Sequence, residues 1–332
     1  MSETGPIGRL LPAFDRLANV ALPFWPLPAE ARATRINLSE NLTYRVDGAE
    51  GPLAVLRVQL DERRTRRAIE TELAWSEELR REGAVETARV LPGRDGHVVQ
   101  MMSGDELERP FLLVMHEFLP GREPPAKGDL SPLYERLGEL AARCHAHARS
   151  SPHAATDGRP EWNAETILGP RFAWGRWQDA PNLSGTDRDL LERVARKVRA
   201  RLDAFGQTPD RYGMVHGDMR LANLLVSGDR LRLIDFDDCG PGWFLSDFAA
   251  SISFMEDDPR VPKWREAWLA GYRRVARLPA DHEALMGTLV MLRRMALLAW
   301  IGSHAEAPEP RRMAADFARR TARLGKAYLE DA

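Results

Sequence analysis

The sequence predicts an α+β fold in two lobes: a small antiparallel sheet with one helix, followed by a larger, mainly helical lobe. Short alternating runs separated by turn residues gather before residue 120. Long runs with apolar residues at spacings of three and four gather after it. Because strands and helices are segregated along the chain, the pattern differs from the alternation of a parallel βαβ protein.

The first lobe is predicted to hold four strands and a helix. The strand-like runs are residues 42–47, 53–59, 97–101 and 111–118. Gly-Ala-Glu-Gly joins the first two as a hairpin signal, and residues 63–83 form a helical pattern that ends at Gly83. A proline-rich stretch near Pro120 marks a hinge. We therefore expect an N-terminal extension at 1–30, an N-lobe at 31–119 and a C-lobe at 120–332.

The second lobe is predicted to be helical around one short hairpin. Apolar stripes predict helices at residues 133–144, 187–205, 262–275, 283–302 and 310–329. The hairpin joins the apolar runs 224–226 and 231–234 and turns at Ser-Gly-Asp.

Composition excludes several classes of protein. The chain has 332 residues, 44% of them hydrophobic and 29% charged, so it can bury a substantial core. A formal net charge of −2 gives no global attraction to nucleic acid or to an anionic membrane. Cys144 and Cys239 form no CxxC pair, which fits a reducing cytoplasm and argues against a cysteine-built zinc site. We expect a cytoplasmic protein with neither nucleic acid nor membrane as partner.

Neither the N-terminus nor the most apolar stretch of the chain is predicted to interact with a membrane. The N-terminus carries Glu3 and lacks the basic region of a secretory signal. The most apolar stretch, residues 284–302, is interrupted by Arg293 and Arg294, so a buried helix is the better interpretation.

Chemically active side chains flank the hairpin at 224–234. Asp218 and Asn223 stand five positions apart, and Asp235 follows the second apolar run. Phosphoryl transfer from a nucleotide needs a carboxylate to orient the acceptor hydroxyl and take its proton, and oxygen ligands for magnesium. An H-x-D-x-x-x-x-N loop followed by D-F-x supplies this set. The alternative is a solvated hairpin with ordinary loop acids.

The segment "HGDMRLANLL…LIDFDDCGPGWFLSDFA" resembles the aminoglycoside phosphotransferase superfamily. This superfamily includes choline kinase, type II homoserine kinase and hydroxylysine kinase, and it has a protein-kinase-like fold. The likeness extends roughly from Thr34 to His304. It implies ATP and Mg²⁺, with Asp218 as catalytic base and Asn223 and Asp235 as metal ligands. It also implies that Asp247 braces the catalytic loop, although a helix N-cap is an equal alternative.

Arg220 lies two residues after Asp218. Protein kinases commonly have a lysine there that faces the transferred phosphate, and a guanidinium could serve the same role. An ordinary surface arginine is the alternative.

The N-lobe departs from the kinase pattern at two places. Arg57 stands on a strand where lysine is usual, and we expect it to pair with Glu72, which falls within the apolar stripe of the following helix. The alternative is that Glu72 lies at the edge of the stripe in water. Arg57 would either bind phosphate oxygens or serve only the pair with Glu72. The phosphate loop has no glycine, so Ser39 and Asn41 either turn around a phosphate or form a plain turn. By position, backbone groups near Glu117 and Leu119 would read adenine.

The acceptor site is predicted from charges in the C-lobe. Asp237 and Asp238 could form an acidic wall for an amine, provide a second metal ligand or cap a helix. Arg293 and Arg294 point about 100° apart on one apolar helix, so at least one should meet a carboxylate of the protein or of the substrate. His145 is interpreted as a core histidine.

The sequence therefore predicts an ATP- and Mg²⁺-dependent kinase. Its acceptor would be a hydroxyl of a small, amine-containing metabolite such as a hydroxy-amino acid, an amino alcohol or an aminoglycoside. One alternative is a stress-response-type protein Ser/Thr kinase, disfavoured because no activation segment separates Asp235 from Asp247. The other is a catalytically silent nucleotide-binding module, which would not need Asp218, Asn223 and Asp235 together.

Overall fold

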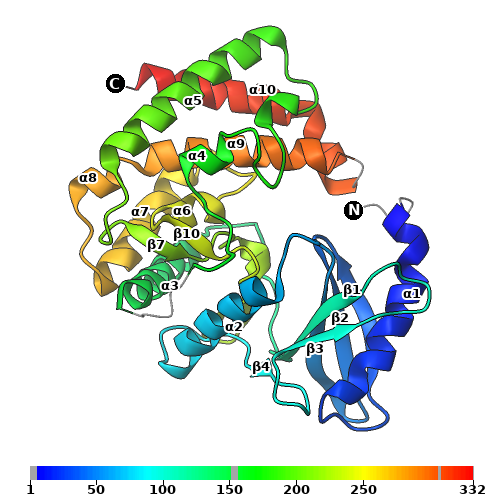
Figure 1. The fold of residues 1–332 in the computed structure, drawn as a ribbon. Helices are drawn as coiled ribbons and strands as arrows, with labels where there is room; N and C mark the ends of the chain where they lie inside the picture. The colour runs from blue at the N-terminus through cyan, green and yellow to red at the C-terminus, as the bar shows by residue number, and fades with distance from the viewer. Residues whose placement is uncertain (1–5, 151–155, 306–307, 332) are drawn as a thin grey trace. The chain divides into compact units, whose positions relative to one another are not determined.

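The computed structural model describes residues 6–150, 156–305 and 308–331 (Figure 1). The first residues considered above, 1–5, lie outside this description. The chain divides into two compact units, residues 1–121 and 122–332.

One antiparallel sheet forms the centre of the first unit. Its strands are β1 (Arg32–Leu38), β2 (Asn41–Gly48), β3 (Gly51–Gln59), β4 (Val90–Leu91), β5 (Val99–Met102) and β6 (Phe111–Glu117). The order is β1-β2-β3-β6, and β4 and β5 pair with successive parts of the other edge of β6. Strands β2, β3, β5 and β6 match the predicted runs, whereas β1 and β4 were not predicted.

Side-chain alternation gives this sheet two buried faces. Leu56, Leu113 and Met115 face α1 (Pro6–Ala21) and the short helix η1 (Leu22–Phe24), and the core on this side includes the edge-to-face pair Phe14–Phe111 at 4.9 Å. Val114, on the opposite face, packs with Ile69 and Leu73 of α2 (Arg66–Arg81). Figure 1 shows the two helices on opposite sides of the sheet.

The helix α1 corrects the prediction of one helix in this lobe. Residues 1–30 were expected to be an extension, yet Leu11, Phe14 and Leu17 are buried in the core of the sheet. Their spacing of three is a helical signal that the sequence does contain. The predicted helix after β3 is present, and the hydroxyl of Thr65 caps it by accepting a hydrogen bond from Ala68 N at 3.1 Å.

The second unit is mainly helical, as predicted. Its helices are α3 (Ser131–Ser150), α4 (Ala164–Ile167), η2 (Trp177–Asp179), α5 (Gly185–Phe205), η3 (Leu221–Asn223), α6 (Ser246–Ser251), α7 (Val261–Val275), α8 (Ala280–Glu283), α9 (Met286–Ser303) and α10 (Pro308–Glu330). Two small antiparallel pairs lie among them. They are β7 (Tyr212–Val215) with β10 (Gly240–Trp243), and β8 (Leu224–Ser227) with β9 (Arg230–Leu233).

Helix α9 is the core helix of the second unit. It packs against α5, α6 and α10, so nearly its whole circumference is buried. By length and composition the segment Ala280–Ser303 could cross a membrane, but 72% of its apolar window is buried inside the protein. Packing within the core therefore accounts for its apolar character, as predicted.

Candidate functional site

The loop between β7 and η3 is fixed by the ring of His216. The Nε2 atom of this ring lies 3.2 Å from the carbonyl of Ile234, and Nδ1 accepts the N–H of Asp218 at 3.3 Å. Burial lowers the pKa of His216, so the ring is neutral and carries its proton on Nε2. His216 is thus a structural residue that ties the loop to the end of β9.

Gly217 allows the loop to turn at this point. Its φ is +80°, which glycine adopts without strain. A Cβ atom there would clash with the carbonyl of Asp238 and come within 2.8 Å of Trp162 Nε1. Any other residue at 217 would push the loop away from the segment that follows Asp235.

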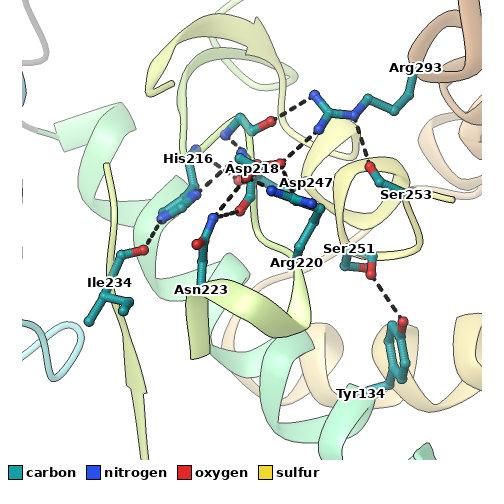
Figure 2. Close-up of polar contacts among 11 residues, drawn as sticks. Tyr134, His216, Asp218, Arg220, Asn223, Ile234, Asp247, Ser251, Ser253 and Arg293 are labelled. Carbon is teal, nitrogen blue, oxygen red and sulfur yellow. Dashed lines mark hydrogen bonds and ion pairs between the residues drawn. The ribbon is translucent and has the colours of Figure 1, made fainter. Parts of the chain in front are cut away.

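The carboxylate of Asp247 braces the same loop through its backbone. Its Oδ2 accepts the N–H of His216 at 3.1 Å, and its Oδ1 accepts the N–H of Gly217 at 2.9 Å (Figure 2). It makes no side-chain cap on α6. The bracing role is therefore confirmed, and the N-cap alternative is wrong.

A buried histidine completes this brace. His145 Nε2 lies 2.9 Å from Asp247 Oδ2, and His145 Nδ1 lies 3.1 Å from the hydroxyl of Tyr272. Burial lowers the pKa of His145 more than Asp247 raises it, so the neutral ring donates from Nε2. Burial would raise the pKa of Asp247, but the hydrogen bonds from His145 and the loop outweigh it and hold the carboxyl ionised.

Replacing Asp247 by Ala is expected to lower the free energy of unfolding by about 3–5 kcal/mol, because two backbone N–H groups and His145 lose their buried acceptor. Urea unfolding followed by circular dichroism measures the change. Asp229→Ala, at an exposed position in the β8–β9 turn, is the matched control and should change stability by less than about 0.5 kcal/mol. Equal effects of the two substitutions would contradict the brace.

The carboxylate of Asp218 meets three donors (Figure 2). Arg220 Nε lies 2.9 and 3.0 Å from its two oxygens, Arg293 Nη2 lies 2.8 Å from Oδ1, and Asn223 Nδ2 lies 2.8 Å from Oδ2. Burial would raise the pKa of Asp218, but the guanidinium groups of Arg220 and Arg293 outweigh it, and the pKa lies below its usual range. Asp218 is therefore an ionised carboxylate in a fixed orientation.

Arg293 is bound on every side by the protein. Besides Asp218 it donates to Ser253 Oγ at 2.9 Å and to the carbonyl of Gly217 at 3.1 Å. Its guanidinium also lies 5.7 Å from the ring centroid of Trp162 and 5.4 Å from that of Trp174. The sequence placed Arg293 among the substrate residues, with a carboxylate of the protein as the alternative partner, and the structure shows it bound to the protein carboxylate of Asp218.

Arg294 points away from this site. It is fully buried, forms an ion pair with Glu256 and donates to Thr321 Oγ1 at 2.8 Å. The structure corrects its assignment as a substrate residue and favours the structural ion pair, which was the other prediction for this helix.

Asn223 and Asp235 are brought together by the hairpin. The N–H of Ile234 donates to the carbonyl of Asn223 at 2.9 Å, so Asp235 follows a residue that is paired with Asn223. The side-chain amide nitrogen of Asn223 donates two hydrogen bonds to Asp218, one to its carbonyl and one to its carboxylate. These bonds fix the amide of Asn223 with its oxygen turned away from Asp218 (Figure 2). Asp235 is exposed, with a φ of +63°. An amide oxygen and a carboxylate are ligands of the kind that a hard divalent cation takes, so the donor chemistry of this pair fits such an ion.

Two residues that were not predicted here anchor the segment after Asp235. Arg159 donates to the carbonyls of Asp237 and, at 2.7 Å, Cys239, while Trp162 Nε1 donates to the carbonyl of Asp238 at 2.7 Å. The side chain of Asp237 is buried and that of Asp238 is partly exposed. The substrate role of both acids remains a prediction.

In the first unit, the predicted pair of Arg57 and Glu72 is confirmed. Arg57 follows Leu56 on β3 and so faces α2, where its Nη2 lies 2.8 Å from Glu72 Oε1, with both side chains buried. Ser39 and Asn41 flank the tight β1–β2 turn, in which Ser39 N donates to Asn41 O at 3.0 Å.

Of the two backbone positions predicted to contact adenine, the structure bears on Glu117. The N–H of Glu117 donates to the carbonyl of Arg89 at 2.9 Å, so that group is not available to adenine. The carboxylate of Glu117 accepts the N–H of Arg89 at 3.0 Å, which makes this residue part of the β6 edge. The role of Leu119 stays a prediction.

Comparisons with known proteins identify the family of this chain. The sequence profile of the Phosphotransferase enzyme family matches residues 32–287. The amicoumacin kinase of Bacillus subtilis (strain 168) is 25% identical over 229 residues, which are 68% of this chain and 63% of that relative. The chain thus matches less than two thirds of the length of this relative.

Two solved structures extend the likeness over nearly the whole chain. A microcompartment-associated aminopropanol kinase is 38% identical, with a TM-score of 0.86, over 95% of this chain and 97% of that one. An amicoumacin kinase solved with AMP-PNP and Ca²⁺ is 22% identical, with a TM-score of 0.74, over 92% of each chain. The predicted superfamily and the protein-kinase-like fold are confirmed, and the chain belongs to the phosphotransferase enzyme family.

Proposed function

We propose that this protein transfers the γ-phosphoryl group of ATP to the hydroxyl of a small amino alcohol. The observation that carries the proposal is the ionised carboxylate of Asp218, which Arg293, Arg220 and Asn223 hold in place. The 38% identity to an aminopropanol kinase supports an amino alcohol rather than a larger amine as acceptor.

The reaction requires one proton to move as one phosphorus–oxygen bond replaces another. The acceptor hydroxyl donates a hydrogen bond to Asp218 and attacks the γ-phosphorus, the bond from the γ-phosphorus to the bridging oxygen breaks, and ADP leaves. Asp218 orients the hydroxyl and takes its proton. Mg²⁺, held by Asn223 and Asp235, would neutralise the charge on the nucleotide phosphates.

The two arginines on Asp218 have different roles in this proposal. Arg293 is buried and has three protein acceptors, so it keeps the base in position. The side chain of Arg220 is 34% exposed, which leaves it accessible to a phosphate that carries a stronger negative charge than Asp218. We therefore assign Arg220 to the transferred phosphoryl group.

The remaining predicted residues complete the proposal. Arg57 with Glu72, the turn at Ser39 and Asn41, and Leu119 would serve the nucleotide, while Asp237 and Asp238 would serve the amine of the acceptor. Both cysteines are free and buried, which supports a cytoplasmic location.

A matched pair of acceptors tests the proposal. Phosphate transfer is followed by ³¹P NMR and by coupled ADP release with aminopropanol, ethanolamine, choline, homoserine and an aminoglycoside. Propanediol, which has the hydroxyl groups but no amine, is the control. We expect kcat/KM to be highest for a small amino alcohol and at least about tenfold lower for propanediol, the loss of one charge-assisted contact. Equal turnover of propanediol would reject the amine requirement, and failure of every acceptor would favour a protein substrate or a silent module.

A further inference from the structure

A hollow lies in the helical unit, among α3, α5, α7 and α8, and its lining does not include the groups that bind Asp218. It is a shallow hollow of about 330 Å³, a volume that includes the open solvent at its mouth, so a ligand would bind at the mouth and not in an enclosed cavity. The residues that carry its chemistry are Arg149, Asp210, Arg211, Tyr272, Arg277 and His282. Figure 1 shows these helices gathered beside β7 and β10.

The charge around this hollow is positive. Arg149, Arg211 and Arg277 bring three cations, and Asp210 is the single acid in the lining. Asp210 is shared between Arg211, at 3.0 Å from Nη2, and His282, at 3.3 Å from Nε2. Burial lowers the pKa of His282, so this ring adds no charge near pH 7. Among the lining residues two positive charges therefore remain unbalanced, and Asp281, outside the lining, adds one negative charge near His282.

Arg277 is free to turn toward a ligand, whereas Arg149 is held loosely beside the hydroxyl of Tyr272, where it opposes the rise that burial causes in the pKa of Tyr272. Arg277 is exposed and has no ion pair within the part of the chain that the structure describes. Arg149 is also exposed, and its guanidinium lies 5.2 Å from the ring centroid of Phe244 in the wall of the hollow. Arg211, in contrast, is fixed by Asp210 and by the carbonyl of Phe205 at 2.8 Å. The fixed arginine gives a preformed wall, and the other two can close on it.

We propose that this hollow binds a small phosphate group. Guanidinium forks bind phosphate oxygens through paired, charge-assisted hydrogen bonds. The walls are otherwise aromatic or aliphatic, from Phe205, Trp243, Phe244 and Leu278, and such walls strengthen a charge interaction by excluding water. The phosphate can be free or part of a phosphomonoester, since both present the same oxygens.

The hollow also adjoins the brace of the catalytic loop. Tyr272 lines it and hydrogen-bonds His145, which in turn hydrogen-bonds Asp247. A phosphate held by Arg149 would thus lie beside the network that positions Gly217 and Asp218. This site goes beyond the proposed function, because it does not depend on which hydroxyl compound is the acceptor.

Calorimetric titration of the whole protein with inorganic phosphate tests the site, with chloride at equal ionic strength as reference. Phosphoethanolamine, titrated separately, distinguishes a monoester from the free ion. We expect the double substitution Arg149→Gln, Arg277→Gln to weaken binding of the better probe at least about tenfold, the loss expected for charged hydrogen bonds. The matched control is Arg143→Gln, Arg196→Gln, two exposed arginines outside the hollow, which should change binding by less than about twofold.

The outcomes separate the possibilities. Binding that is lost in the first double variant and kept in the second supports the site, whichever probe binds. No binding of either probe to the unsubstituted protein, or equal binding by both double variants, overturns it. Because Arg277 has no ion pair in the described residues, Arg277→Gln alone leaves the fold intact, and its weaker binding keeps the test valid if the double variant unfolds. Phosphate bound only at the nucleotide site would be unaffected by either pair.

Discussion

Asp218→Asn is expected to lower kcat by about 10³-fold, within the range that general bases contribute, while the KM for ATP changes little. The amide cannot take the proton of the acceptor hydroxyl, although it has nearly the same shape as the carboxylate. No role in holding the nucleotide is assigned to Asp218, so binding of ATP should survive. Steady-state kinetics with the best acceptor measures both parameters.

The control for this substitution is Asp229→Asn, which removes an exposed carboxylate from the turn of the neighbouring β8–β9 hairpin and should leave kcat unchanged within about twofold. Circular dichroism must show that both variants are folded. If Asp218→Asn turns over as fast as the unsubstituted protein, another group takes the proton and the mechanism fails. The phosphate site proposed above would not be affected by that result.

Residues of the site that are close together in sequence could be predicted, whereas contacts between residues far apart in sequence could not. The spacing of Asp218, Asn223 and Asp235 placed them around the ends of one hairpin, because a turn and a register fix residues that are few positions apart. Arg293 is 75 residues from Asp218, and Arg159 is 78 residues from Asp237. No local pattern encodes these contacts, since they depend on how α9 and the segment before α4 pack.

The elements of the fold likewise divide into those that follow from local sequence and those that depend on long-range packing. Helix α2 and the strands β2 and β3 follow from local periodicity and turn residues. Helix α1 has an apolar spacing of three as well, but a proline-rich stretch follows it at residues 21–30, and residues 1–30 were assigned as an extension. Only the packing of α1 on the sheet shows that it belongs to the core. The short strand β4 has two residues, too few for any periodicity, and it exists because β6 offers it an edge.

The adjacent arginines of α9 give the second large expected effect. Arg293→Gln should lower kcat at neutral pH by about 10- to 100-fold, because the carboxylate of Asp218 loses both a positive charge and a fixed orientation. The presence of Arg293 lowers the pKa of Asp218, and the base works when ionised, above that pKa. Removing the charge raises the pKa, so the acid limb of the kcat/KM profile should move to higher pH. Assays from about pH 5 to about pH 8 measure it.

Two further variants separate charge from geometry. Arg293→Lys keeps the charge but cannot bind Asp218, Ser253 and the carbonyl of Gly217 together, so it should restore the acid limb without restoring kcat. Arg294→Gln breaks a buried pair with Glu256 and should cost about 3–5 kcal/mol of stability. In molecules that remain folded, its acid limb should stay in place. An acid limb that moved equally in Arg293→Gln and Arg294→Gln would mean that α9 acts through packing alone, and not through the contact with Asp218.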